Sequence, residues 1–301
     1  RTTSSAASDV YKRQDYFITP FYEYVFMQRA LIGGLIVSLG SVPVGIFMTL
    51  RRMSLTGDAM AHAILPGAAI AYLISGLSLL GLAIGGVVAG LIVALSAGIV
   101  ARSSHIKEDA SFASFYLIAL AFGVLVISLK QSNVDLFHVL FGNILAVDDS
   151  TLWLLTFNSC LSLFVMAFLY RPLIIECFDS QFLETSGHAS AVAHYGFLFL
   201  MVINLVSGFL ALGTLMAIGI MVLPATAARF WVNSIDYILI TALSFSFFSC
   251  YCGLLISYYF DLPSGPAIIM SMGVLCILSI LIGANGGVLR ANRANKHLKN
   301  S

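Results

Sequence analysis

The sequence predicts an all-α membrane protein with about eight to ten transmembrane helices, and three observations lead to this fold class. Of the 301 residues, 59% are hydrophobic and only 10% are charged, whereas soluble domains have about 45–50% apolar and about 25% charged residues. The mean hydropathy is +0.97. Apolar runs such as 30–50 and 79–101 reach the ~20 residues that a helix needs to cross a bilayer.

The chain divides into segments by polarity. Residues 1–14 are polar and fit no membrane pattern, so we expect a disordered leader or a sequence scar there. Residues 15–287 should form the transmembrane domain, and 288–301 a basic tail. Nine apolar segments are the expected spans, namely 30–50, 58–75, 79–101, 112–129, 151–170, 195–212, 215–231, 235–260 and 263–282.

One further apolar segment, 134–147, is too short to cross and too apolar for an aqueous loop, which predicts a re-entrant segment. In the span 79–101 the glycines Gly81, Gly85, Gly86 and Gly90 form overlapping small-xxx-small steps that let helices approach closely.

The charges set the expected orientation and exclude one class of partner. Six basic residues fall on one side of the predicted membrane together with the basic tail, and the positive-inside rule makes that side cytoplasmic. These residues are Arg51, Arg52, Arg102, Lys107, Arg171 and Arg229. A net charge of +1 gives no basic field that would bind nucleic acid.

Asp58 and His62 are the first candidate metal site. They stand four residues apart in an apolar segment, so both side chains share one helix face. A carboxylate and an imidazole are suitable ligands for zinc, manganese or iron. Ionisable groups inside membranes are costly and usually functional, although a hydrogen bond that merely joins packed helices is the alternative.

A second pair, Asp135 and His138, stands three residues apart near the predicted outer surface. It could be an entry site for a metal ion, or simply polar residues at the edge of a loop.

Two prolines are candidate hinges. Pro66 should remove the hydrogen bond to the His62 carbonyl, and Pro224 the bond to the Ile220 carbonyl. We expect each to kink its helix, and Pro66 to open the helix of Asp58 and His62 towards a pathway.

The polar segment 173–190 on the basic side has apolar residues near helical spacing. A helix lying on the membrane surface and a docking helix for a cytoplasmic partner both fit this pattern. The chain has no phosphate-binding loop, zinc-protease motif or nucleophile elbow. We therefore do not expect an enzyme, and any ATP hydrolysis must occur on another chain.

Four stretches together resemble one family. "LRRMSLTGDAMAHAILPGAAIAYL", "VDLFHVLFGNILAVDD", "YRPLIIECFD" and "GTLMAIGIMVLPATAARF" are similar to the membrane permease of bacterial ABC importers for zinc, manganese or ferrous iron. The resemblance covers about residues 17–287, with the motifs in the family's order.

The resemblance implies a homodimer in the bacterial inner membrane, two ATP-binding subunits on the cytoplasmic face and a metal-binding protein outside. It also implies that Asp58 and His62 hold metal in transit. The docking reading of the polar segment becomes the favoured one, with Phe178, Asp179, Phe182, Leu183 and Gly187 coupling to the ATPase.

The expected function is therefore the transmembrane subunit of an ATP-driven divalent-metal importer that works by alternating access. Zinc is slightly favoured over manganese and iron, as transported substrate rather than resident cofactor. A proton-coupled secondary transporter without an ATPase is the main alternative. A membrane enzyme or metal-sensing receptor is a weaker one, because no catalytic or signalling machinery is visible.

Overall fold

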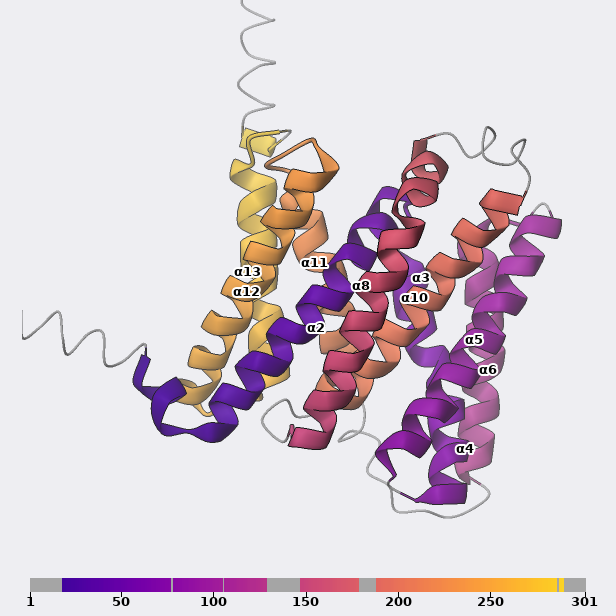
Figure 1. The fold of residues 1–301 in the computed structure, drawn as a ribbon, viewed down its shortest axis with the longest axis horizontal. Helices are drawn as coiled ribbons and strands as arrows, with labels where there is room; N and C mark the ends of the chain where they lie inside the picture. The colour runs from indigo at the N-terminus through magenta and orange to yellow at the C-terminus, as the bar shows by residue number, and fades with distance from the viewer. Residues whose placement is uncertain are drawn as a thin grey trace, which may run out of the picture.

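The computed structural model describes residues 18–76, 78–104, 106–128, 147–178, 188–285 and 287–289. Ten labelled helices pack into one bundle (Figure 1). In chain order they are α2 (Val25–Leu50), α3 (Ser54–Ala63), α4 (Leu65–Ser75), α5 (Leu79–Ser103), α6 (Glu108–Ser128), α8 (Asp149–Phe178), α10 (His188–Leu212), α11 (Thr214–Ala228), α12 (Ile235–Phe260) and α13 (Ser264–Ile282).

Eight spans among the described residues are long and apolar enough to cross a membrane, with α3 and α4 together forming one of them. This confirms the predicted fold class, within its range of eight to ten helices. The predicted seventh span, 215–231, is the 15-residue helix α11. At 1.5 Å per residue α11 is only ~22 Å long, shorter than the ~30 Å hydrocarbon layer.

The observed helix boundaries differ most from the predicted ones around the polar segment 173–190. The span expected at 151–170 continues as α8 to Phe178, and the one expected from 195 begins as α10 at His188. Both extensions carry buried polar groups that contact each other, Glu176 on α8 and His194 on α10. These tertiary contacts stabilise helical turns that the local polarity does not indicate. The predicted re-entrant segment lies outside the described residues, apart from Val147.

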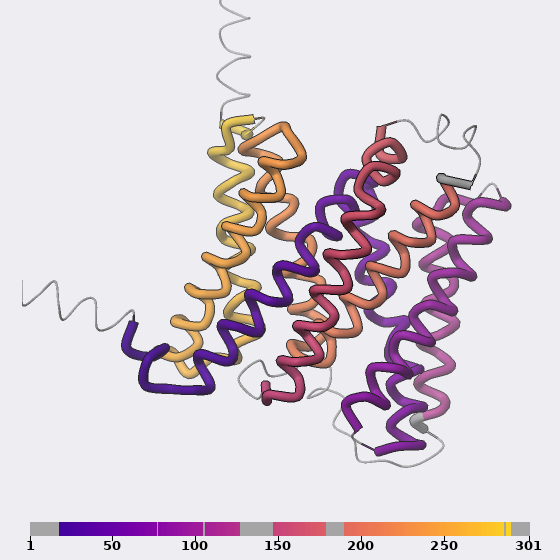
Figure 2. Tube along the Cα trace, viewed as in Figure 1, coloured from indigo at the N-terminus to yellow at the C-terminus, as the bar shows by residue number. Residues whose placement is uncertain are grey.

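Two hydrophobic cores hold the bundle together, and α2 belongs to both. Val44, Phe47 and Met48 pack into a core with α3–α6, α8 and α10. Val42 and Ile46 pack into a second core with α11, α12 and α13. Figure 2 shows α2 crossing the centre of the molecule, with the late helices on one side of it and the α4–α6 group on the other.

Glycines allow the closest helix contacts. A Cβ atom at Gly45 of α2 would lie 1.7 Å from the Met221 carbonyl oxygen of α11, and one at Gly85 of α5 would lie 2.4 Å from the Gly67 oxygen of α4. Backbones can approach this closely only where no side chain intervenes. The predicted role of Gly85, Gly86 and Gly90 in helix packing is therefore confirmed.

Apart from Arg29, the described basic residues gather at one end of the bundle, as predicted. The C-termini of α2 and α5 and the N-termini of α6 and α10 meet there with Arg51, Arg102 and Lys107 (Figure 1). We call this the basic end. Arg29 lies at the opposite end of α2, where it pairs with Asp149 at 2.8 Å.

Candidate functional site

The helix α3 holds the predicted Asp58–His62 pair inside the bundle. It packs against α2, α5, α6, α10 and α11, so most of its circumference is covered by protein. Gly57 allows part of this packing, because a Cβ atom there would lie 3.1 Å from the Met48 methyl carbon of α2. The remaining face of α3 carries the two polar side chains.

Asp58 and His62 do share one face, as the spacing predicted. His62 Nε2 lies 3.8 Å from Asp58 Oδ1, and the side chains are 36% and 66% exposed, respectively. The imidazole also faces Tyr116 of α6, with 6.3 Å between ring centroids. The carboxylate is therefore open on the side that the chain itself does not cover, which leaves both groups available to a ligand.

Pro66 lies just beyond the pair, but the helix is interrupted before it. The break falls at Ile64, whose N–H donates to the His62 carbonyl, and α4 begins at Leu65. Pro66 thus occupies the first turn of α4, where a proline's missing N–H leaves no intrahelical bond unmade. Its ring packs against α6, where a Cβ atom at Gly123 would lie 3.0 Å from it. The interruption is observed, and its role as a hinge stays a prediction.

The pair alone does not form a closed metal site. Within the residues that the structure describes, no three His, Cys, Asp or Glu side chains come together as a group that could hold a metal ion. Two ligands per chain would bind weakly compared with a four-ligand structural site. Such weak binding suits an ion that must leave again.

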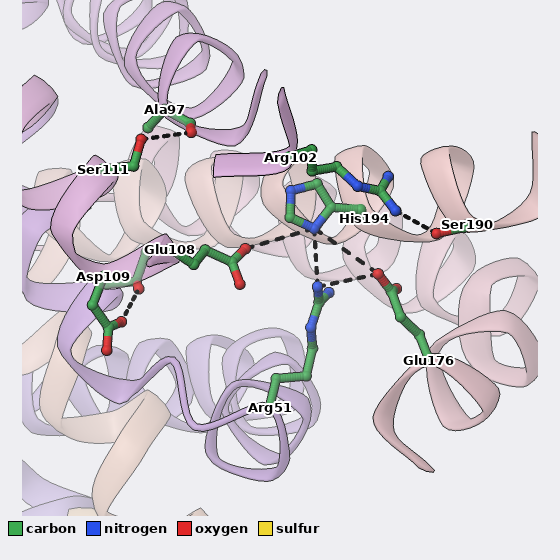
Figure 3. A network of polar contacts seen from close by, with 10 residues as sticks. Arg51, Ala97, Arg102, Glu108, Asp109, Ser111, Glu176, Ser190 and His194 are labelled. Carbon is green, nitrogen blue, oxygen red and sulfur yellow. Dashed lines mark hydrogen bonds and ion pairs between the residues drawn. The ribbon is translucent and has the colours of Figure 1, made fainter. Parts of the chain in front are cut away.

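A second polar group was not predicted from the sequence. Arg51, Glu108, Glu176 and His194, from four different elements, meet at the basic end (Figure 3); we call them the Arg51 cluster. Arg51 Nη2 donates to Glu176 Oε1 at 3.2 Å and to His194 Nδ1 at 2.9 Å. The side chains of Arg51, Glu176 and His194 are only 9%, 7% and 4% exposed. Buried charges of this kind require a partner.

The contacts of Arg51 fix the form of the histidine. A guanidinium has donors but no acceptor, so His194 Nδ1 must accept, and the ring proton sits on Nε2. The imidazole is therefore neutral in this arrangement. The Glu108 Oε1 atom, 3.7 Å from Nδ1, approaches it as a neighbour rather than as the partner of a charged ring.

Further contacts attach the Arg51 cluster to its surroundings. The Phe197 ring lies under the Arg51 guanidinium at 4.9 Å, which favours the cation. Arg102 of α5 donates to Ser190 of α10, and Thr56 of α3 donates to Asp109 of α6 at 3.3 Å. The cluster also lines a cavity of about 550 Å³ at the basic end.

The other predicted site residues are only partly placed. Phe178 is the last residue of α8 and its side chain is exposed, and its role in docking stays a prediction. Pro224 is buried within α11. The remaining candidates, Asp135, His138, Asp179, Phe182, Leu183 and Gly187, lie outside the described residues.

One sequence signal for the Arg51 cluster existed. Glu176 is the only acidic residue in the apolar stretch that ends α8, as in "LIIECF", and a lone acid in such a stretch needs a cation. Its partner is 125 positions away in the chain, so local spacing could not identify it.

Comparison with known proteins identifies the family. The profile of the ABC 3 transport family matches residues 23–283. The manganese transport system membrane protein MntC of Listeria monocytogenes is 32% identical over 273 residues, covering 91% of this chain and 96% of that protein. The manganese import system permease protein ScaB of Streptococcus parasanguinis is 31% identical, covering 95% of this chain and 98% of that protein.

An iron relative and a solved structure agree with this match. A probable iron transport system membrane protein of Haemophilus influenzae is 30% identical, covering 88% of this chain and 96% of that protein. The solved structure of PsaBC from Streptococcus pneumoniae in complex with Fab superimposes with a TM-score of 0.79 at 30% identity. It covers 92% of this chain and 98% of that chain. The chain belongs to the ABC 3 transport family and is a multi-pass membrane permease.

Proposed function

We propose that this chain is the transmembrane subunit of an ATP-driven importer of divalent transition metal ions, in which Asp58 and His62 hold the ion in transit. The observation that carries the proposal is the open carboxylate on α3. Asp58 is 66% exposed on the one open face of a helix whose other faces pack against the bundle, and Leu55, one turn before it on this face, is also exposed. A charge at such a place is costly against lipid, so its open face must meet water or another subunit.

A homodimer would satisfy this condition. A two-fold axis places the same surface of both copies against each other, so a second Asp58–His62 pair could face the first. Four ligands would then surround the pathway, with each chain supplying two. Carboxylate and imidazole ligands accept manganese, iron and zinc alike.

Manganese is the first cargo to test. The sequence motifs slightly favoured zinc, but two of the relatives reported above are named for manganese and one for iron. The donor set does not choose among the three ions, so iron and zinc remain alternatives that the same experiment can separate.

The energy source is proposed to be a separate ATPase. The chain contains no phosphate-binding loop, and its membership of an ABC transport family supports a partner that hydrolyses ATP. Phe178 and the segment 179–187 would form its docking site on the cytoplasmic side, and a metal-binding protein would deliver the ion from the other side in the bacterial inner membrane.

The test is uptake into proteoliposomes that contain the permease, its ATP-binding subunit and its metal-binding protein. Radiolabelled manganese, iron and zinc are compared for the wild type, Asp58→Ala, His62→Ala and the control Asp261→Asn. Asp261 is an exposed aspartate with a φ of 50°, which asparagine also tolerates. We expect ATP-dependent uptake that the two alanine variants lose and the control keeps.

Two results would contradict the proposal. Uptake by the permease alone under a pH gradient would indicate the proton-coupled secondary transporter. Normal uptake by both alanine variants would leave the importer in place but assign Asp58 and His62 a structural role.

A further inference from the structure

The Arg51 cluster lies between α3, which carries Asp58 and His62, and the two helix ends that flank the segment 179–187. Glu176 stands in the last turn of α8, which leads into that segment, and His194 stands in the second turn of α10, which follows it. Arg51 follows the last residue of α2, just before α3. A single guanidinium therefore touches both helices that bracket the segment (Figure 3).

The turn between Arg51 and α3 is tightly closed. Met53 N–H donates to Met48 O at 2.9 Å and Arg52 N–H donates to Thr49 O at 3.3 Å, the two bonds of a Schellman motif. Arg52 takes the left-handed conformation that this motif requires, with a φ of 59°. A displacement of Arg51 should therefore reach the start of α3 rather than dissipate in a loose loop.

The connection from Arg51 through α3 leads to the Asp58–His62 pair. From Ser54, the first residue of α3, Asp58 lies ~6 Å and His62 ~12 Å along the helix axis. The short helix is interrupted at Ile64, so it can tilt or rotate without the whole 22-residue span moving. Thr56 ties its first turns to α6 through Asp109.

The cluster also has polar groups for a second arrangement. Arg51 Nη1 and Glu108 Oε1 are buried and have no hydrogen-bond partner among the residues that the structure describes. One is a donor just after the end of α2, and the other is an acceptor on α6. The adjoining cavity of about 550 Å³ leaves room for the side chains to exchange partners. Two discrete arrangements are what a coupling element requires.

We propose that Arg51 is a positioning residue that transmits movement of the α8 and α10 ends, which flank the ATPase-docking segment, to α3 and thereby to Asp58 and His62. This inference rests on the proposed function. It assigns Arg51 no contact with the metal ion or with ATP.

The test is Arg51→Met in the reconstituted complex, with two readouts besides uptake. The first is the number of metal ions transported per ATP hydrolysed, and the second is the stimulation of ATP hydrolysis by the metal-loaded binding protein. Coupling between two sites typically corresponds to a change of about 5- to 150-fold in binding affinity, which sets the scale for this test. We expect both readouts to fall at least about fivefold, while ATPase docking and metal binding by the detergent-solubilised complex remain.

A matched control and a double variant separate transmission from simple stability. Arg171→Met removes an exposed arginine from α8 at the same end and should leave both readouts unchanged. Arg51→Met leaves Glu176 buried without its cation, so Arg51→Met/Glu176→Met is also measured, because replacing both partners by apolar residues is often tolerated.

The double variant decides the question. If it assembles and stays uncoupled, transmission through Arg51 is supported. If it regains the wild-type number of ions per ATP, Arg51 only balanced the charge of Glu176 and the proposal is overturned. If the wild type itself shows no ATP-dependent uptake, the proposed function fails first, and that result is distinct because it does not depend on any variant.

Discussion

The Asp58–His62 pair and the Arg51 cluster combine similar chemical groups in opposite surroundings. Both contain a histidine beside a carboxylate. The pair belongs to one helix, has an atom separation of 3.8 Å and is substantially exposed. The cluster joins four elements and contains a cation, and its members Arg51, Glu176 and His194 are almost fully buried. Groups left open are available for a ligand, whereas groups closed by partners hold helices in position.

The largest expected difference concerns the loss of one carboxylate from each region. Glu176→Leu leaves the Arg51 guanidinium buried without its acid, which typically costs about 3–5 kcal/mol. Asp58→Leu removes an exposed group and should cost less than about 0.5 kcal/mol. Thermal unfolding of the detergent-solubilised permease checks this contrast. Equal shifts of the midpoint would show that the two regions do not differ in the way the structure indicates.

A smaller contrast is expected between the two histidines. His194→Leu removes the acceptor of a hydrogen bond from a charged donor, a loss of about 1.5–3 kcal/mol. His62→Leu should leave the unfolding midpoint nearly unchanged but weaken manganese binding. Calorimetric titration with manganese, together with thermal unfolding, distinguishes the two effects. A lower unfolding midpoint for His62→Leu than for His194→Leu would contradict this prediction.

Thr56 tests the connection between the two regions. Thr56→Val keeps the shape of the side chain but removes its bond to Asp109, at a cost of about 0.5–1.5 kcal/mol. The control is Thr226→Val, because Thr226 donates only within its own helix, to Val222 O at 2.9 Å. Thermal unfolding should show a greater loss of stability for Thr56→Val than for the control. A greater loss of stability for the control would contradict a stabilising hydrogen bond between α3 and α6.

The smallest expected effect is on the pH dependence of fold stability, and it comes from Asp148 at the end of the bundle opposite the basic end. Asp148 is exposed like Asp58, yet hydrogen bonds from Ser150 and Thr151 lower its pKa from 3.8 to about 2. A lowered pKa in the folded state stabilises the fold at pH values above the ordinary pKa of the carboxyl group. This contribution is lost as the pH falls through about 2.

The measurement is the unfolding midpoint between about pH 5 and pH 2, a range chosen from the pKa values of an aspartate. Asp148→Asn keeps an acceptor oxygen at the start of α8 but cannot titrate. We expect part of the acid-induced decrease in the midpoint to disappear in this variant. An identical pH profile in both proteins would show that Asp148 does not contribute.

The sequence was sufficient for eight of the nine predicted spans and for the shared face of the pair, for a physical reason. Hydropathy and the i, i+4 spacing are local properties, and α5, α12 and Asp58–His62 follow directly from them. The Arg51 cluster could not be predicted, because Glu176 and His194 meet Arg51 across 125 and 143 positions. The same contacts extend α8 and α10 beyond their apolar stretches, which explains why those boundaries were predicted short.

Proline positions show a similar limit. The sequence predicted one helix kinked at Pro66, whereas the structure shows two helices with a break at Ile64. Whether the break moves during transport depends on the second conformation of the whole bundle, which spacing does not encode. The short length of α11 was also not predicted, because the apolar residues Phe230 and Trp231 extend its pattern although residues 229–231 form a turn rather than helix.

The place of α2 in both hydrophobic cores has a consequence for how the protein is made. The ribosome produces α2 before α12, yet Ser38 on α2 pairs with Ser246 on α12, 208 residues later, at 2.7 Å. Until α12 emerges, the Ser38 hydroxyl has only the Gly34 carbonyl of its own helix as a partner. α2 therefore completes its contacts only after α12 has been synthesised, so the packing of α2 depends on a helix that the ribosome makes much later.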